Sequence, residues 1–202
     1  MKIFNIVLLL FAFGLMPFIF GCSSSATEPE ENRDLVLFQD ENNKWGYKDA
    51  ITGKIIIEPK YNYALEFREN LAVVAINLKY GFIDKKGNEI IPLKYDRCFS
   101  FSESMAAIRL NNQYGFIDKK GNEIIPPKYE NFYFAFNRDI HGFCEGLVAV
   151  QLDKWGFIDK TGKVVIPFEY DRAEAFIKGQ VRVTLDNYTF CINNKNIQVI
   201  CN

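Results

Sequence analysis

A phrase of apolar and polar residues recurs five times along the chain, and each copy predicts three short β-strands. The first strand of a copy is rich in β-forming residues, as in Leu71–Ile76. An aromatic-Gly-Phe-Ile-Asp strand follows, and a turn closed by glycine leads into a returning strand that is expected to stop at Pro92. The first strand has its counterparts at Leu35–Phe38, Met105–Leu110, Leu147–Leu152 and Val181–Leu185. Since no segment sustains a helical period, we predict an all-β array of five three-stranded units of about 34 residues.

An aromatic residue followed by glycine recurs at the start of the second predicted strand. The pairs are Trp45-Gly46, Tyr80-Gly81, Tyr114-Gly115 and Trp155-Gly156, with a worn copy at Tyr188-Thr189, and the glycine positions are 35, 34, 41 and 33 residues apart. Because glycine has no Cβ, we expect a neighbouring backbone or ring to lie directly against the strand there. We expect the aromatic rings to pack between units as core residues. The alternative is that these rings line a ligand-binding groove.

These phrases and the Ile-Ile-Pro, Tyr and Phe that follow them resemble the WG repeats of bacterial proteins. The resemblance covers this chain from about Leu35 to Ile200. The resemblance implies an all-β fold that is widely found on secreted and lipoprotein chains, and whose biochemical role is mostly unassigned. Two arrangements of the units remain open, an open solenoid-like array and a small closed β-propeller. We favour the open array, because the fifth copy is degraded as a terminal cap would be.

The N-terminus carries a different kind of segment. A short cationic start and an almost wholly apolar run predict a secretory signal at residues 1–21. Ile19-Phe20-Gly21-Cys22 resembles the lipobox of bacterial lipoproteins, which implies that Cys22 becomes the lipid-bearing first residue of the mature chain. The alternative is an ordinary signal or an uncleaved anchor. Residues 22–34 are then a lipidated cysteine and a polar tether, and residues 35–202 are the repeat domain.

The lipobox resemblance also indicates a location. A serine directly after the lipidated cysteine, here Ser23, implies transfer to the outer membrane of a two-membrane bacterium. We therefore expect the chain to reside in the bacterial cell envelope, attached to the membrane through its N-terminal lipid.

Composition narrows the function classes. Nineteen Phe and ten Tyr exclude wholesale disorder, and 24 basic against 25 acidic residues argue against nucleic-acid binding. The single histidine, His141, excludes a metal site built from several histidines of one chain. No G-x-S-x-G, H-E-x-x-H, P-loop or C-x-x-C motif occurs. We therefore assign no catalytic residue, metal ligand or cofactor.

Charged residues recur with the same period as the strands. Asp84, Asp118 and Asp159 stand at the first position of a turn, where an Asp side chain accepts hydrogen bonds from the following amides, although a row of metal ligands is the alternative. Lys85-Lys86 and Lys119-Lys120 would lie along one edge of the array. Acidic neighbours favour a mixed-charge edge over a site for a polyanion.

One unit carries an insertion. The spacing of 41 residues implies about seven extra residues within Asn131–Phe143, an aromatic-rich segment of the kind that displays binding residues. The candidate binding residues are Phe132, Tyr133, Phe134, Phe136, Arg138 and His141. The alternative is a loop that only covers one face of the core.

Four cysteines follow Cys22, and an even number in an exported chain permits two disulfides. Stacking of neighbouring units would bring Cys98 toward Cys144, and Cys191 with Cys201 would staple the last hairpin. The alternative is that the thiols are free and buried.

Two classes of function remain. The first is a non-catalytic binding or interaction scaffold that presents an edge of the array or the 131–143 loop to a protein or glycan. The second is an envelope hydrolase with a carboxylate pair such as Glu145 and Asp139 in a cleft. We prefer binding, because the residues that depart from the repeat in the inserted segment are mostly aromatic.

Overall fold

The computed structural model describes residues 35–134 and 141–201, which form five antiparallel β-sheets and no helix. Sheet 1 contains β1 (Leu35–Gln39), β2 (Trp45–Asp49) and β3 (Ile55–Tyr61). Sheet 2 contains β4 (Tyr63–Ala64), β5 (Ala72–Ile76), β6 (Lys79–Ile83) and β7 (Glu89–Tyr95). Sheet 3 contains β8 (Arg97–Cys98), β9 (Met105–Leu110), β10 (Gln113–Asp118) and β11 (Glu123–Tyr129). Sheet 4 contains β12 (Asn131–Phe132), β13 (Leu147–Gln151), β14 (Trp155–Asp159) and β15 (Val164–Tyr170), and sheet 5 contains β16 (Arg172–Ala173), β17 (Gln180–Leu185), β18 (Tyr188–Asn193) and β19 (Gln198–Val199).

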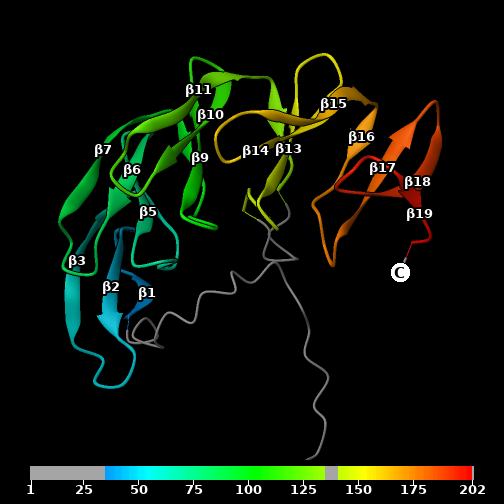
Figure 1. Ribbon diagram of the computed structural model, residues 1–202. Helices are drawn as coiled ribbons and strands as arrows, with labels where there is room; N and C mark the ends of the chain where they lie inside the picture. The colour runs from blue at the N-terminus through cyan, green and yellow to red at the C-terminus, as the bar shows by residue number, and fades with distance from the viewer. Residues whose placement is uncertain (1–34, 135–140, 202) are drawn as a thin grey trace, which may run out of the picture.

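The sheets follow one another in chain order along an arc, with sheet 1 and sheet 5 at its opposite ends (Figure 1). Strands pair only with neighbours in their own sheet throughout the described ranges, and no sheet closes on itself. The prediction of an all-β open repeat array is therefore confirmed. Residues 1–34, with the signal segment and the tether, lie outside the described residues. No helix that could span a membrane occurs in the part of the chain that the structure describes.

Sheets 2 to 5 each hold one strand more than the three that the sequence predicts. The additional strands, β4, β8, β12 and β16, are two residues long and lie at one edge of their sheets. A strand of two residues has no alternation of apolar and polar positions, so the sequence pattern does not reveal it.

The expectation that the returning strand stops at Pro92 is wrong, because β7 continues to Tyr95. β7 is an edge strand, so the missing N–H of the proline leaves no neighbouring strand without a donor. The strand pairing shifts from Phe82 opposite Ile91 to Tyr80 opposite Tyr95, and the extra residues form a bulge around the proline.

This bulge explains the glycine that follows each repeat aromatic. The backbone of the outer strand lies so close that a Cβ at the glycine would clash with a carbonyl oxygen, at a distance below 3.0 Å. For Gly46, Gly81, Gly115 and Gly156 the distances to the carbonyl oxygens of Ile57, Ile91, Ile125 and Ile166 would be 2.5, 2.4, 2.5 and 2.9 Å. The predicted close approach of a neighbouring backbone is confirmed.

The aspartates at the turns cap them, as predicted. The amides of Thr161 and Lys163 donate to the Asp159 carboxylate at 2.9 and 3.0 Å, and Asp84 and Asp118 accept equivalent bonds. The hydroxyl of Thr161 donates to Asp159 at 2.6 Å and, with these amides, lowers the pKa of the carboxyl. Gly162, with φ of +83°, closes the turn in a conformation that favours glycine.

Ring pairs hold each sheet against the next. In each pair an aromatic residue from the second strand of a three-stranded repeat unit packs against a Phe that precedes the first long strand of the following sheet. The ring centroids lie 4.8 Å apart in Tyr47–Phe67, 4.8 Å in Phe82–Phe101, 5.1 Å in Phe116–Phe143 and 5.1 Å in Phe157–Phe176. Phe143 takes this role in sheet 4 although the insertion displaces it along the sequence. These interfaces bury the core between neighbouring sheets.

Glutamates form a second link between neighbours. The carboxylate of Glu69 in sheet 2 accepts hydrogen bonds from the amide of Ser104 in sheet 3. It also forms an ion pair with Lys119 of sheet 3 at 3.0 Å. Glu103 of sheet 3 in turn binds the amide of Gly146 and the side chain of Lys160 in sheet 4. These ion pairs make the lysine-bearing edge a mixed-charge edge, in agreement with the interpretation from sequence.

The same link joins sheets 4 and 5, where Glu145 accepts a hydrogen bond from the amide of Gly179 at 2.8 Å. In sheet 5 the corresponding position is Lys178. A lysine has no acceptor to offer a following turn, so the glutamate series ends with the last sheet, as expected of a terminal unit.

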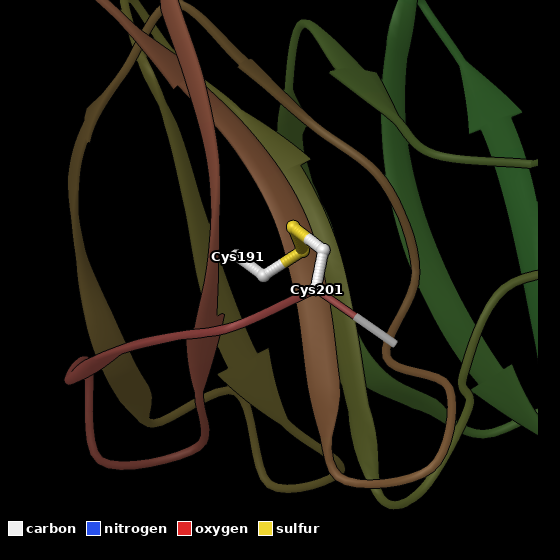
Figure 2. The surroundings of a disulfide bond; sticks show 2 residues. All are labelled: Cys191 and Cys201. Atoms are coloured by element: carbon white, nitrogen blue, oxygen red, sulfur yellow. A yellow bond between two sulfur atoms is a disulfide. The ribbon is translucent and has the colours of Figure 1, made fainter.

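A disulfide closes the end of the array. Cys191 on β18 bonds to Cys201, which follows β19, and this confirms the predicted staple of the last hairpin (Figure 2). Cys98 is a free, buried thiol, so the predicted approach of Cys98 to Cys144 does not produce a bond between them. Burial raises the pKa of the Cys98 thiol well above its ordinary value and keeps it protonated.

Candidate functional site

The described residues of the inserted segment belong largely to the core. Phe132 is buried with its ring 4.8 Å from that of Phe99, and the ring of Phe134 lies 4.9 Å from Phe99 and 5.4 Å from Phe132. His141 is 7% exposed. Phe136, Arg138 and the Asp139 of the hydrolase hypothesis lie outside the described residues. Among the candidate loop residues that the structure describes, Tyr133 alone borders the cavity described next.

A cavity of about 540 Å³ lies where sheet 4 meets sheet 5. Its walls are formed by Tyr133, Trp155, Asp171, Arg172, Ala173, Glu174, Arg182, Thr184 and Thr189. The volume is in the range of small-molecule sites, and the lining combines aromatic rings with a few polar groups, as such sites do.

A small residue at Ala173 leaves room beside Trp155. One sheet earlier, Tyr114 holds the position of Trp155 and packs against Phe132 at 5.2 Å. The strand pairing places Phe132 opposite Val150 and Ala173 opposite Val183, so Ala173 occupies in sheet 5 the position of Phe132 in sheet 4. A methyl group therefore stands where a phenyl ring fills the preceding interface, and small residues, Ala64 and Cys98, also hold this position in sheets 2 and 3.

The cavity extends over the edge of sheet 5. Along β16 and the residue that follows it, Arg172 and Glu174 point to one face and Ala173 to the other, because side chains alternate along a strand. All three line the cavity, and β16 is an edge strand. The cavity therefore reaches from the interface with sheet 4 around this edge to the outer face of sheet 5.

The outer face of sheet 5 departs from the repeat. The strand register places Arg182 at the position held by Val73, Ala107 and Ala149 in sheets 2, 3 and 4. Those three residues are at most 2% exposed, because each faces the next sheet, whereas Arg182 is exposed. Thr189 likewise takes the place of the repeat glycine, and its hydroxyl lies 3.0 Å from that of Thr184.

The charged side chains of the cavity differ in their ion pairs. Asp171 forms a hydrogen-bonded ion pair with Lys154 and accepts a hydrogen bond from the amide of Asp186 at 2.8 Å. The Lys154 bond, with that amide, lowers the pKa of Asp171 and keeps it ionised. Arg172 and Arg182 are exposed, and neither makes an ion pair within the two described ranges. In the same ranges no three His, Cys, Asp or Glu side chains gather as a metal site would require.

One known family matches most of the repeat domain. The WG containing repeat matches residues 45–79, 80–114, 114–154 and 155–188. The chain belongs to the WG containing repeat family. Four of the five units in the WG array are matched in this way, and the fifth, worn copy beyond residue 188 is not.

Solved structures show a similar fold at low sequence identity. A structure of Hsv2 from Kluyveromyces lactis has a TM-score of 0.50 and 12% identity and covers 84% of this chain. A second, with a complete loop 6CD, has a TM-score of 0.50 and 12% identity and covers 83% of this chain. The WG array spans 60% and 58% of the length of these two Hsv2 chains, so the likeness concerns the fold alone. No curated protein matches the chain.

Sequence reasoning identified Trp155 and Tyr133 but missed the arginines and threonines of the cavity. The available signal was the comparison of equivalent positions between WG units. Arg182 departs from an otherwise small apolar position, and Thr189 departs from glycine. The Thr189 change was interpreted only as wear of a terminal copy and Arg182 was not singled out, because the sequence does not show that they share a cavity with Trp155.

Proposed function

We propose that this WG repeat protein is a non-catalytic binding protein of the bacterial cell envelope, which takes a protein or glycan partner in the cavity between sheets 4 and 5. The observation that carries the proposal is a cavity whose lining departs from the repeat at Arg182 and Thr189. The ring pair Phe157–Phe176 packs this interface as its counterparts pack the others, and the cavity lies beside Trp155 at the edge of the same interface. The cavity offers two aromatic rings and two arginines to a ligand.

The membrane attachment in this proposal is a lipid on Cys22. It is supported by the lipobox-like Ile19-Phe20-Gly21-Cys22, and Ser23 favours the outer membrane. Several acyl chains would hold the chain at the bilayer permanently, since each buried methylene contributes about 0.8 kcal/mol. The tether of residues 23–34 would then separate the array from the lipid surface.

The hydrolase alternative has less support. A glycosidase needs one carboxyl with a raised pKa as general acid, beside a second carboxylate. Glu145 accepts the amide hydrogen of Gly179 between sheets 4 and 5, which is a structural role. In the cavity, the pKa of Asp171 is lowered by the bond from Lys154, the direction opposite to that of a general acid.

Metabolic labelling with a fatty-acid analogue tests the anchor. We expect label on the full-length protein in a bacterial host and none on Cys22→Ala, because only an N-terminal cysteine at a lipobox receives the lipid. Cys98→Ala is the matched control, since it removes a buried thiol of the array and should leave the label in place. Label that persists on Cys22→Ala would contradict the lipoprotein assignment.

A screen for binding and cleavage tests the function. The full-length protein is incubated with an array of bacterial envelope and plant oligosaccharides, and each oligosaccharide that binds is then analysed by mass spectrometry for cleavage. We expect binding without any change in mass. Cleavage that is lost in Glu145→Gln, Asp139→Asn or Asp171→Asn would overturn the non-catalytic role.

A further inference from the structure

We infer that the cavity between sheets 4 and 5 binds an acidic saccharide, with the carboxylate of a uronic acid at Arg172 and Arg182 and a sugar ring against Trp155 and Tyr133. This inference rests on the proposed binding function and names the chemical class of its ligand.

The two arginines are diagonal neighbours on the outer face of sheet 5. The register sets Arg172 of β16 directly opposite Thr184 of β17, and Arg182 lies two residues along β17 on the same face. Diagonal neighbours of this kind are about 7–8 Å apart, which two arginine side chains span easily. A guanidinium presents its donors in a planar fork that matches a carboxylate.

The charge balance of the cavity favours an acidic ligand. Its arginines, with Lys154 at its margin, supply three positive charges against the two of Asp171 and Glu174. Because Lys154 binds Asp171, the excess of positive charge is carried by the two arginines.

The remaining lining favours a saccharide over other acids. A sugar ring has a C–H face that packs on the rings of Trp155 and Tyr133, and hydroxyls that bond to Thr184 and Thr189. A fatty acid would use neither threonine. An acidic peptide that added to the edge of sheet 5 would find a strand of only two residues, too short to template a further strand.

Titration calorimetry on the full-length protein in detergent tests the inference. The probes are trisaccharides of galacturonate, glucuronate and mannuronate, each beside its methyl ester, which keeps the rings and hydroxyls and removes the charge. We expect at least one acid to bind about ten-fold or more tightly than its ester, a difference of about 1.4 kcal/mol. Binding should weaken as the salt concentration is raised from about 0.05 to 0.5 M, because the arginines are exposed.

Matched variants locate the site. Arg172→Gln and Arg182→Gln should each weaken binding of the acid about ten-fold or more and leave binding of the ester unchanged. Arg97→Gln is the control, because Arg97 holds the same position in sheet 3, with its guanidinium over the Phe99 ring, and should not alter binding. Circular dichroism confirms that each variant is folded.

Three results would overturn the inference. They are equal binding of acid and ester, no binding of any of these trisaccharides, and binding of a glutamate-rich peptide in their place. Each of these leaves the non-catalytic binding role intact, since that role fails only if a bound oligosaccharide is cleaved.

Discussion

Gly115→Val is expected to destabilise the protein by more than about 3 kcal/mol, in the range of severe core lesions. A Cβ at this position would lie 2.5 Å from the carbonyl oxygen of Ile125 and 2.6 Å from the backbone nitrogen of Pro127. Both atoms belong to backbone of β11, which cannot rotate away as a side chain would. The bulge at the proline would have to open, and the pairing of β10 with β11 would be lost around it. Urea unfolding of the variant and the parent chain measures the difference.

Thr189→Val is the matched control for this variant. Thr189 stands at the glycine position of the worn unit, so its backbone already accommodates a Cβ of the same branched shape. The change removes only the exposed hydroxyl contact with Thr184, and we expect a loss below about 1 kcal/mol. If the two variants lowered the melting midpoint equally, the close approach of the outer strand would not be what the glycine permits.

Removal of residues 171–202 is expected to leave sheets 1 to 4 folded. The links between sheets are made by neighbours alone, namely the ring pairs and the glutamates that bind the next turn. The cut falls at Asp171 because β16 pairs with β17 and belongs to the last sheet. In an array of this kind, stability is approximately a sum of unit and interface terms, so the loss of one end does not unfold the rest.

The truncation uncovers the apolar face of sheet 4 that packs against sheet 5, including Ala149, Phe157 and Ile166. A second truncated chain carries Ala149→Arg, which copies the arginine found at this position in the natural last sheet, Arg182. We expect this variant to be the more soluble of the two and to unfold at the same urea concentration within about 0.5 M. It keeps the test decisive if the first truncation aggregates.

The regular part of this fold could be predicted from sequence, because the same pattern of residues recurs in each unit. Five copies of one phrase placed the long strands, the glycine at the close approach and the aspartate at the turn. The continuation of β7 beyond Pro92 was missed, since the penalty for proline in a strand vanishes at a bulged edge. The short edge strands were missed because two residues carry no alternation.

The candidate site could be predicted only in part. Trp155 and Tyr133 stood out as aromatic residues, but their neighbours in the cavity come from the following sheet. The strand register determines which residues face Trp155, and it places Ala173 at the position of Phe132. Bulges shift this register by amounts that cannot be read from the sequence. Arg172 and Arg182 therefore entered the site only when the register was known.

Urea unfolding of the truncated chain, followed by far-UV circular dichroism beside the full-length chain, tests the central claim that neighbouring sheets alone sustain an open array. The account predicts a cooperative transition in both, with a smaller dependence of the unfolding free energy on urea in the truncated chain, because less surface is exposed when four sheets unfold. A truncated chain with no cooperative transition, in both the parent and the Ala149→Arg form, would contradict it. Sheet 5 would then support sheet 1 across a closed ring.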